Sequence, residues 1–415
     1  MALLLEGLTF LHEYAYSWLH TVPQKKDNAL KVGVLSTALI NIGGSAHTIY
    51  RPYHTLWVTN NKGYTSRIVI EPCKTHEDVI LWGIASHDAE TASEYAFKHG
   101  FKVSYGSYDE LLADPQIDFI YISLPNSLHF EWACKSLKAG KHVLLEKPFT
   151  SNAKEAEILV DLAKKEDKVL LEAFHWQFHP AAHRFREILD SGKLGDILKT
   201  DSRMTSTPSV PAGDIRWKYE LSGGSLMDAS YTVSFTRFAL HARTPDAILY
   251  AKAHPAKHDP RVDSSMHATL RFKGSGESDV YSTTYTDLAR PWLYGIIPRF
   301  WEFPSIKVET EHAEVYFYNA MLPHLYHYIG ITDKKTRKTR YEQVYKGGLM
   351  WKDRGETWWS TYRYQLEAFA DKVRGREPVW WIPGDDSINE MKTIDEIYRT
   401  SGLALRPTSM YALQP

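Results

Sequence analysis

The order of apolar and amphipathic segments in the first half of the chain constrains the fold more than any other feature of the sequence. Short apolar runs with the length of buried strands alternate with segments that carry helix-start and helix-stop residues. The runs lie at residues 31–36, 79–86, 102–105, 119–123, 142–145 and 169–172. Strands that alternate with helices in this way predict a mostly parallel sheet joined by right-handed crossovers.

Capping residues predict where several of the helices begin and end. Ser107 is followed three residues later by Glu110, and Asn152 is followed in the same way by Glu155. Both pairs are typical of helix starts. Gly100 comes directly after a helical segment and predicts its end.

The strand at 142–145 ends in Glu146, Lys147 and Pro148. Charged residues at the carboxyl end of a central parallel strand lie in the crevice where doubly wound sheets bind ligands. Pro148 lacks a backbone donor and biases Lys147 toward extended geometry. Lys147 is therefore a candidate site residue, and the simpler alternative is a surface lysine before a loop.

The first strand is followed by the place where a dinucleotide-binding fold has its glycine-rich turn. Gly33 fits the first glycine of that turn, and Ala38 fits its small third position. In the strict spacing Leu35 replaces the second glycine, and in a looser spacing Ser36 does, with Thr37 after it. Either side chain would hinder close contact between the backbone of the turn and a pyrophosphate. An apolar strand without a cofactor therefore stays open as an alternative.

Two stretches near the N-terminus do not fit a simple βαβ pattern. Residues 42–67 have no clean period where a helix would be expected, which is long for a structureless loop in a compact domain. They are either a genuine insertion or sequence that the working protein lacks. Residues 1–30 predict an amphipathic helical arm and a linker, because leucines recur at helical spacing without the pattern of a signal peptide or a membrane span.

Charge and cysteine content exclude several classes of protein. The formal net charge of the 415 residues is −1, so nothing predicts attraction to nucleic acid or to an anionic membrane. Cys73 and Cys134 give neither a disulfide framework nor a metal-ligand spacing. We expect a cytoplasmic protein with no metal site and no membrane span.

The second half of the chain has a different pattern. A Rossmann domain over 31–176 is predicted to be followed by an α+β domain over 177–415 with an open, mostly antiparallel sheet, because strand-like runs follow one another with short turns. The runs lie at 197–205, 247–254, 266–272, 279–285, 305–310 and 313–318. Its aromatic residues exceed what one sheet face can bury, so we expect the outer face to form a homodimer. These aromatics include Trp301, Tyr316, Tyr318, Tyr326 and Tyr328.

Six motifs follow one another in a fixed order. They are Leu124-Pro-Asn-Ser-Leu-His129, Gly140-Lys-His-Val-Leu-Leu-Glu-Lys-Pro148, Glu172-Ala-Phe-His-Trp-Gln-Phe-His-Pro180, Gly223-Gly-Ser-Leu-Met-Asp228, Tyr364-Gln-Leu-Glu-Ala-Phe369 and Met391-Lys-Thr-Ile-Asp-Glu-Ile-Tyr398. Together they resemble the Gfo/Idh/MocA oxidoreductases, and within them a fungal-type branch of the dimeric dihydrodiol dehydrogenase and NADP-dependent D-xylose 1-dehydrogenase subgroup. The resemblance implies hydride transfer between a nicotinamide cofactor and a hydroxyl of a small-molecule substrate, either a sugar, a polyol or a diol.

The resemblance also implies roles for residues at matching positions. Lys147 matches the lysine that contacts substrate and the nicotinamide ribose. The family places its acid–base residue, Tyr or His, four residues after the aspartate that here is Asp228. Position 232 is a threonine, so we place a one-residue gap before Tyr231 and assign Tyr231 as the acid–base group, with Asp228 holding the geometry. The other cofactor-binding residues that the resemblance implies are Leu124, Pro125, Asn126, His129 and Glu146.

This chemistry is consistent with the side chains themselves. A phenol with an ordinary pKa of about 10 is a poor base at neutral pH. A nearby ammonium such as Lys147 would lower the pKa of Tyr231. The alternative is that Asp228 caps a helix and Tyr231 only packs.

The end of the second strand bears on the choice of dinucleotide. Ser86 is small and polar, and His87 stands where NADP-using relatives often carry Arg, which suits a 2′-phosphate. Asp88 would favour NAD if it pointed at the ribose. We therefore expect NADP, with NAD as the alternative. Gln177 where relatives often have Arg, together with Ser36 in the turn, leaves a second function open: a non-catalytic, dinucleotide-binding or regulatory relative.

Overall fold

The computed structural model describes residues 22–36, 68–206, 209–274, 278–297, 299 and 301–413. The predicted insertion at 42–67 and most of the predicted N-terminal arm lie outside these residues. No helix in the described part of the chain is long and apolar enough to cross a membrane.

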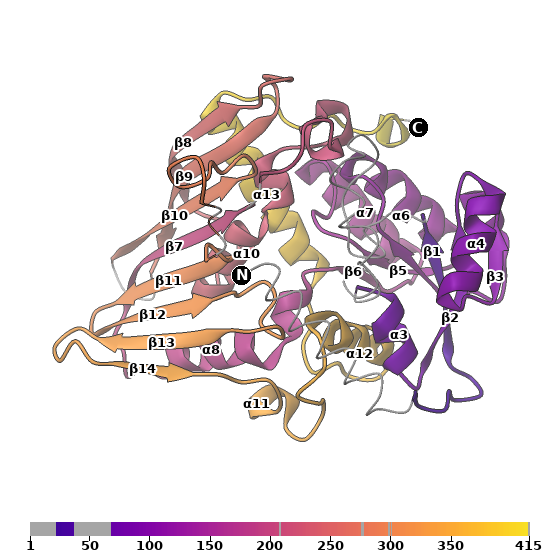
Figure 1. Ribbon diagram of the computed structural model, residues 1–415, viewed down its shortest axis with the longest axis horizontal. Helices are drawn as coiled ribbons and strands as arrows, with labels where there is room; N and C mark the ends of the chain where they lie inside the picture. Colours follow the sequence, from indigo (N-terminus) through magenta and orange to yellow (C-terminus); the bar gives the residue numbers. More distant parts are fainter. Residues whose placement is uncertain are drawn as a thin grey trace.

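A six-stranded parallel sheet forms the core of the first half. Its strands are β1 (Leu30–Leu35), β2 (Val79–Ala85), β3 (Val103–Tyr105), β4 (Phe119–Ile122), β5 (His142–Leu145) and β6 (Leu170–Glu172). They are arranged in the order β3-β2-β1-β4-β5-β6, which confirms the predicted parallel sheet (Figure 1). The order reverses between β1 and β4, and such a switch point is where doubly wound sheets bind ligands.

The helices of this half begin and end where local capping allows. They are α3 (Ile70–Thr75), α4 (Ala89–His99), α5 (Tyr108–Ala113), α6 (His129–Lys138) and α7 (Ala153–Lys165). The Asn152 side chain accepts from the Glu155 N–H at the start of α7, and Ser107 does the same for Glu110 at the start of α5. Gly100 ends α4 with φ +84°, a left-handed conformation that favours glycine.

An open eight-stranded sheet dominates the second half. Its strands are β7 (Ile197–Thr205), β8 (Ala247–Pro255), β9 (Asp263–Lys273), β10 (Asp279–Asp287), β11 (Ser305–Thr310), β12 (Ala313–Tyr318), β13 (Tyr328–Asp333) and β14 (Thr339–Glu342). Their order is β14-β13-β12-β11-β7-β10-β9-β8, and all neighbours are antiparallel except β7 and β10. The predicted open, mostly antiparallel sheet is confirmed, and β13 and β14 are additional strands.

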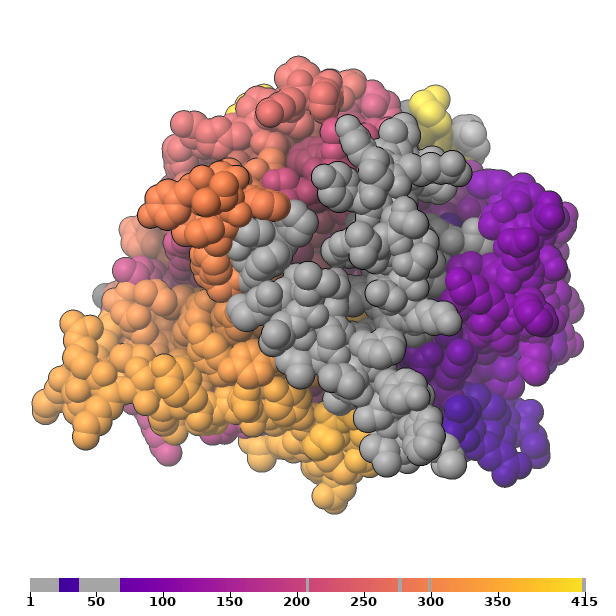
Figure 2. Space-filling model, in the orientation of Figure 1, coloured from indigo at the N-terminus to yellow at the C-terminus, as the bar shows by residue number. Residues whose placement is uncertain are grey.

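The two faces of this sheet differ. Along β12, Val315 and Phe317 are fully buried, whereas Tyr316 and Tyr318 alternate with them and are half-buried. The inner face packs on helices, among them α10 (Tyr231–Leu240) and α13 (Gly384–Ser401). Figure 2 shows the β13–β14 hairpin projecting at the left of the molecule. The remaining helices are α8 (Pro180–Asp190), α9 (Ser225–Asp228), α11 (Gly348–Trp351) and α12 (Thr361–Val373).

Candidate active site

The carboxyl ends of five strands meet at one edge of the parallel sheet. In the register, Leu35 of β1 is level with Ala85 of β2 and Ile122 of β4. Leu145 of β5 is level with Ile122 and with Glu172 of β6. The residues that follow these positions therefore start at the same height, which brings most of the predicted site residues to one edge.

The turn after β1 begins at Ser36 and not at Gly33. Gly33 lies inside β1, where a Cβ would come within 2.8 Å of Leu111 and 3.0 Å of Ile120, so its role is packing and the predicted placement in the turn is wrong. Ser36 has φ +88°, which costs a non-glycine residue about 1–2 kcal/mol. This conformation explains why a glycine suits the position. Thr37 and Ala38 lie outside the described residues.

Ser86, His87 and Asp88 follow β2. His87 is exposed, and its ring contacts that of Tyr108 at 4.6 Å between centroids. Asp88 accepts from the Thr91 N–H at 2.9 Å and caps α4. The Asp88 carboxylate therefore binds the start of α4. It does not accept a hydrogen bond from a ribose 2′-hydroxyl, which is the contact that would favour NAD.

The segment after β4 is tied to neighbouring loops. Leu124 is buried, and Pro125 and Asn126 are partly exposed. The Asn126 amide nitrogen donates to the Ser222 carbonyl at 3.1 Å, which connects the two halves of the chain.

His129 is buried between two of these loops. Its Nδ1 lies 2.8 Å from the Pro148 carbonyl oxygen, and its Nε2 lies 2.9 Å from that of Leu124. Burial lowers the pKa of His129 to about 4, so the ring is neutral and donates to one of the two. His129 thus ties the loop after β4 to the loop after β5, and its direct contact with a cofactor stays a prediction.

Glu146 and Lys147 follow β5 and point to different partners. The Glu146 carboxylate is buried and accepts from the Tyr121 hydroxyl at 2.5 Å. Burial raises its pKa. Lys147 Nζ donates to the Asp228 carbonyl oxygen at 2.7 Å, and it lies 3.5 Å from the Asp228 carboxylate and 5.1 Å from the centre of the Tyr231 ring. The structure therefore brings the three predicted catalytic residues together.

Arg216 is the second cation at Asp228. Arg216 Nε lies 3.0 Å from Asp228 Oδ2, and its Nη1 lies 3.2 Å from Asp214 Oδ1. Although burial opposes it, Arg216 and Lys147 hold the pKa of Asp228 down to about 2. Asp228 is therefore ionised at neutral pH and is held on both sides.

Tyr231 is almost fully buried at the start of α10. Its hydroxyl lies 2.8 Å from His175 Nε2. Burial raises the pKa of Tyr231 well above its ordinary value, and the negative groups around it add to the rise. This is the opposite of the lowering expected from Lys147, because removal of the phenol from water outweighs one ammonium.

A buried ion pair supports the Gly223–Gly224 loop that precedes Asp228. Arg406 Nη2 and Asp263 Oδ1 are 2.6 Å apart, and neither side chain is exposed. Arg406 also donates from Nε to the Gly223 carbonyl at 2.6 Å, while Asp263 accepts from the Ser225 hydroxyl at 2.6 Å. Gly224 has φ +135°, and a Cβ there would lie 2.2 Å from Asp263 Oδ1, so the loop requires glycine.

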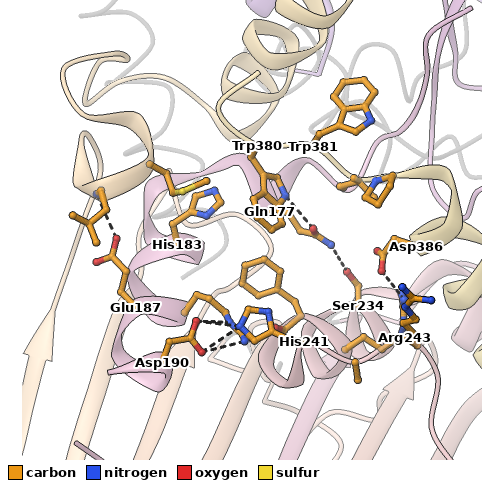
Figure 3. A pocket seen from close by; sticks show the side chains of 18 residues that line it. Gln177, His183, Glu187, Asp190, Ser234, His241, Arg243, Trp380, Trp381 and Asp386 are labelled. Carbon is orange, nitrogen blue, oxygen red and sulfur yellow. Dashed lines mark hydrogen bonds and ion pairs between the residues drawn. The ribbon is translucent and has the colours of Figure 1, made fainter. Parts of the chain in front are cut away.

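Gln177, the departure from the family pattern, lies in the wall of a separate cavity of about 630 Å³. Its amide nitrogen donates to Ser234 Oγ at 3.2 Å, and its oxygen accepts from Trp380 Nε1 at 3.3 Å (Figure 3). Lys147, Asp228 and Tyr231 are not in the lining of this cavity. The Gln177 side chain thus joins α10 to the segment before α13.

His175 and Arg216 contact the predicted catalytic residues and were not predicted from the sequence. His175 stands in the motif after β6, so the rule that strand ends carry the site could have identified it. Arg216 lies several residues before the Gly223–Gly224 loop, and no pattern in the sequence links it to this loop. No group of three or more His, Cys, Asp or Glu residues in the described ranges could hold a metal ion.

The described part of this edge fits a dinucleotide. The strand order reverses between β1 and β4, the turn residue Ser36 is left-handed, and β2 is followed by a small hydroxyl and an exposed imidazole. Ser36, Ser86 and His87 would hold the adenosine side, and Lys147 would lie by the nicotinamide ribose.

Comparison with known proteins agrees with this arrangement. Residues 62–174 match an oxidoreductase family with an NAD-binding Rossmann fold, and residues 182–296 match the GFO/IDH/MocA C-terminal domain. An NADP-dependent D-xylose 1-dehydrogenase of Haloferax volcanii is 31% identical over 321 residues, which cover 77% of this chain and 88% of that protein. A trans-1,2-dihydrobenzene-1,2-diol dehydrogenase of Xenopus tropicalis is 31% identical over 219 residues, which cover 52% of this chain and 64% of that protein.

Solved structures share the fold at lower identity. A 3-ketoreductase from Actinomadura kijaniata, in complex with TDP-benzene and NADP, has a TM-score of 0.67 at 21% identity, covering 89% of this chain and 96% of the other. An aldose–aldose oxidoreductase from Caulobacter crescentus, complexed with glycerol, has a TM-score of 0.68 at 19% identity, covering 90% and 98%.

Proposed function

Because this chain belongs to the GFO/IDH/MocA family of NAD(P)-dependent oxidoreductases, we propose that it moves a hydride between a nicotinamide dinucleotide and the carbinol carbon of a sugar, polyol or diol. The observation that carries this proposal is the meeting of a phenol, an ammonium and a carboxylate at the carboxyl edge of the parallel sheet. The three groups belong to Tyr231, Lys147 and Asp228. The names of the relatives, which act on xylose and on a dihydrodiol, support this substrate class.

Tyr231 donates and accepts the proton in this proposal. When bound, the nicotinamide supplies or accepts the hydride. In the reduction of a ketone, the substrate oxygen gains negative charge and takes the phenol proton. Burial keeps the pKa of Tyr231 high, so the phenol carries its proton at neutral pH and is ready to donate.

Lys147 and Asp228 provide the electrostatics of the site. The Lys147 ammonium is fixed by the Asp228 carbonyl oxygen at 2.7 Å, and from there it stabilises negative charge on the substrate oxygen. The Asp228 carboxylate is also paired with Arg216, so it holds Lys147 without neutralising it. The site thus offers one mobile proton and one fixed positive charge.

We propose NADP as the dinucleotide. His87 is exposed at the end of β2 beside Ser86, while Asp88 is turned to the start of α4. The His87 imidazole can donate a hydrogen bond to a 2′-phosphate, and the Asp88 carboxylate accepts from the Thr91 N–H at the start of α4. The NADP specificity in the name of the Haloferax relative supports this choice.

We also propose a homodimer through the outer face of the eight-stranded sheet. Tyr318 and Tyr328 stack there at 4.9 Å between centroids, and Tyr326, Tyr341 and Trp301 around them are exposed. Exposed aromatic clusters of this kind are found more often at protein–protein contacts than on surfaces that face only solvent. Light scattering that gives a single monomer mass at micromolar concentration would refute the dimer and leave the enzymatic proposal unaffected.

One experiment tests the activity. Tryptophan fluorescence titrated with NADPH and NADH measures binding, and absorbance at the reduced-nicotinamide band measures turnover across aldoses and diols. Tyr231→Phe should lower kcat about 10²- to 10⁴-fold with NADPH binding unchanged. The matched control is Tyr285→Phe, which removes the hydroxyl bonded to Asp287 in β10 and should keep full activity. Dinucleotide binding without turnover of any substrate would instead favour a non-catalytic relative.

A further inference from the structure

A chain of hydrogen bonds connects Tyr231 with three residues that the proposed catalysis does not use. The Tyr231 hydroxyl lies 2.8 Å from His175 Nε2, and His175 Nδ1 lies 2.8 Å from Thr361 Oγ1. Thr361 Oγ1 lies 3.3 Å from His324 Nδ1. Tyr231, His175 and Thr361 are buried, whereas His324 is partly exposed. The chain therefore connects a buried phenol with a group near solvent.

We propose that His175, Thr361 and His324 form a proton relay for Tyr231, and we call these three residues the relay. They come from three separate parts of the chain: the segment after β6, the start of α12 and the loop between β12 and β13. They act through Tyr231 and touch no reacting atom. This inference rests on the proposed dehydrogenase function and explains how its acid–base group is recharged.

The relay balances the protons of the reaction. As hydride leaves the carbinol carbon for the nicotinamide, the substrate hydroxyl gives its proton to the Tyr231 oxygen. The Tyr231 proton moves to His175 Nε2, the proton on His175 Nδ1 moves to Thr361 Oγ1, and the Thr361 hydroxyl proton moves to His324 Nδ1. His175 and Thr361 each gain one proton and lose one. The positive charge lost from the nicotinamide thus reappears on His324, and ketone reduction runs the sequence backwards.

The contact with the Thr361 backbone sets the protonation state that the relay needs at His324. The Thr361 N–H donates to His324 Nδ1 at 3.3 Å, which marks that nitrogen as unprotonated before the step. It can therefore receive a proton. The Tyr362 ring lies against His175 with centroids 3.9 Å apart and fixes the plane of the imidazole. Both His175 nitrogens are then aimed at their partners.

Burial explains why one histidine would not suffice. Burial lowers the pKa of His175 well below its ordinary value, and His324 and Lys147 add to the effect. A proton left on His175 would be an uncompensated buried charge, which is costly. A relay that passes one proton on as it receives another avoids this charge, and the partly exposed His324 can exchange its proton with water.

Three variants and one control test the relay. His175→Gln keeps hydrogen-bonding atoms but cannot pass a proton, and Thr361→Val keeps the shape but removes the hydroxyl. His324→Gln tests the outer end, where folding is least at risk. Each should lower kcat about 10- to 100-fold in both directions, with KM and the NADPH dissociation constant within twofold of wild type. Thr200→Val removes a buried hydroxyl bonded to Ser282 in the sheet and should change none of these.

Two further readouts separate a relay from a structural role. When the rate is plotted against the deuterium fraction of an H₂O–D₂O mixture, the wild type should give a bowed curve, because several protons move. The Thr361→Val variant should give a straight line. ¹⁵N spectra of histidine-labelled protein should show the His175 signals, identified by their loss in His175→Gln, in the Nδ1–H form, which needs no substrate. A His175 proton on Nε2 instead would overturn the relay as written.

The possible failures are distinguishable. If Tyr231→Phe abolishes activity but the relay variants keep wild-type kcat, or if Thr200→Val loses as much, the relay is wrong and the proposed function stands. If the wild-type protein turns over no sugar, polyol or diol, the proposed function is wrong and the relay falls with it.

Discussion

Replacing Arg216 with glutamine should lower kcat/KM about 30-fold while leaving NADPH binding intact. The guanidinium Nε lies 3.0 Å from Asp228 Oδ2, and the two side chains are 19% and 21% exposed. Exposed ion pairs contribute about 0–1 kcal/mol, and breaking a buried pair costs about 3–5 kcal/mol. The Arg216–Asp228 pair is about one-fifth exposed, so its loss should cost an amount between these limits, about 2 kcal/mol. A loss of about 2 kcal/mol in transition-state stabilisation corresponds to about a 30-fold decrease in kcat/KM.

The loss should fall on the transition state for a geometric reason. Without Arg216, the Asp228 carboxylate would turn toward Lys147 Nζ, which is already 3.5 Å away. The ammonium would then be neutralised by the carboxylate instead of facing the substrate oxygen. The pKa of Asp228, now about 2, would move toward its ordinary value near 3.9, so Asp228 stays ionised at pH 7 and protonation does not cause the loss.

Steady-state kinetics at pH 7, with NADPH titrated by fluorescence and folding followed by thermal melting, tests this reasoning. The matched control is Arg261→Gln, because Arg261 pairs with Asp259 and Glu220 at 2.7 Å and is half exposed. The control should keep wild-type kcat/KM. A kcat/KM for Arg216→Gln within threefold of wild type, or an equal loss in the control, would refute the argument.

Three other outcomes are expected. His87→Arg should tighten NADPH binding about tenfold and leave NADH binding unchanged in fluorescence titrations, because guanidinium binds phosphate through two charged hydrogen bonds; equal tightening of both contradicts this. Burial raises the pKa of Glu390 to about 7, so the folded protein holds a proton that the unfolded chain releases near 4.3, and stability falls as pH rises between these values. The melting temperature of the Glu390→Gln variant minus that of the wild type should therefore increase between pH 5 and pH 8. A difference that stays constant over this range would show that the Glu390 carboxyl is not titrating there. Ser36→Gly should tighten dinucleotide binding about three- to tenfold, since it opens the turn to the pyrophosphate and suits φ +88°; weaker binding would mean that the hydrogen bond between Ser36 and Tyr108 matters more.

Features set by neighbouring residues could be predicted from the sequence. Asn152 and Ser107 cap helices as expected because their partners lie three residues away. Gly33 was assigned to the turn because spacing in the sequence does not show whether a glycine lies inside a strand or in the turn that follows it. The bounds of β1 and the packing of Leu111 against Gly33 in the structure distinguish the two.

Features set by distant residues could not be predicted. Strand β13 includes Gly330 and ends in Asp333, which weakens its pattern, and it forms because Ile329 pairs with Phe317 of β12. His175 was visible within a motif, but its partner Thr361 is 186 residues away in the sequence. Lys147 was a candidate from its place at the end of a strand, whereas Asp228 and Tyr231 were predicted because the resemblance supplied this long-range information.

The Arg406–Asp263 pair beneath the Gly223–Gly224 loop affects how the protein forms during translation. All strands of the parallel sheet have been synthesised once residue 172 has left the ribosome, so this sheet can begin to fold early. The loop before Asp228 gains its support only when Arg406 emerges, on the order of tens of seconds later at about 5–20 residues per second. A nascent chain would therefore acquire its nucleotide-binding half well before its catalytic centre is complete.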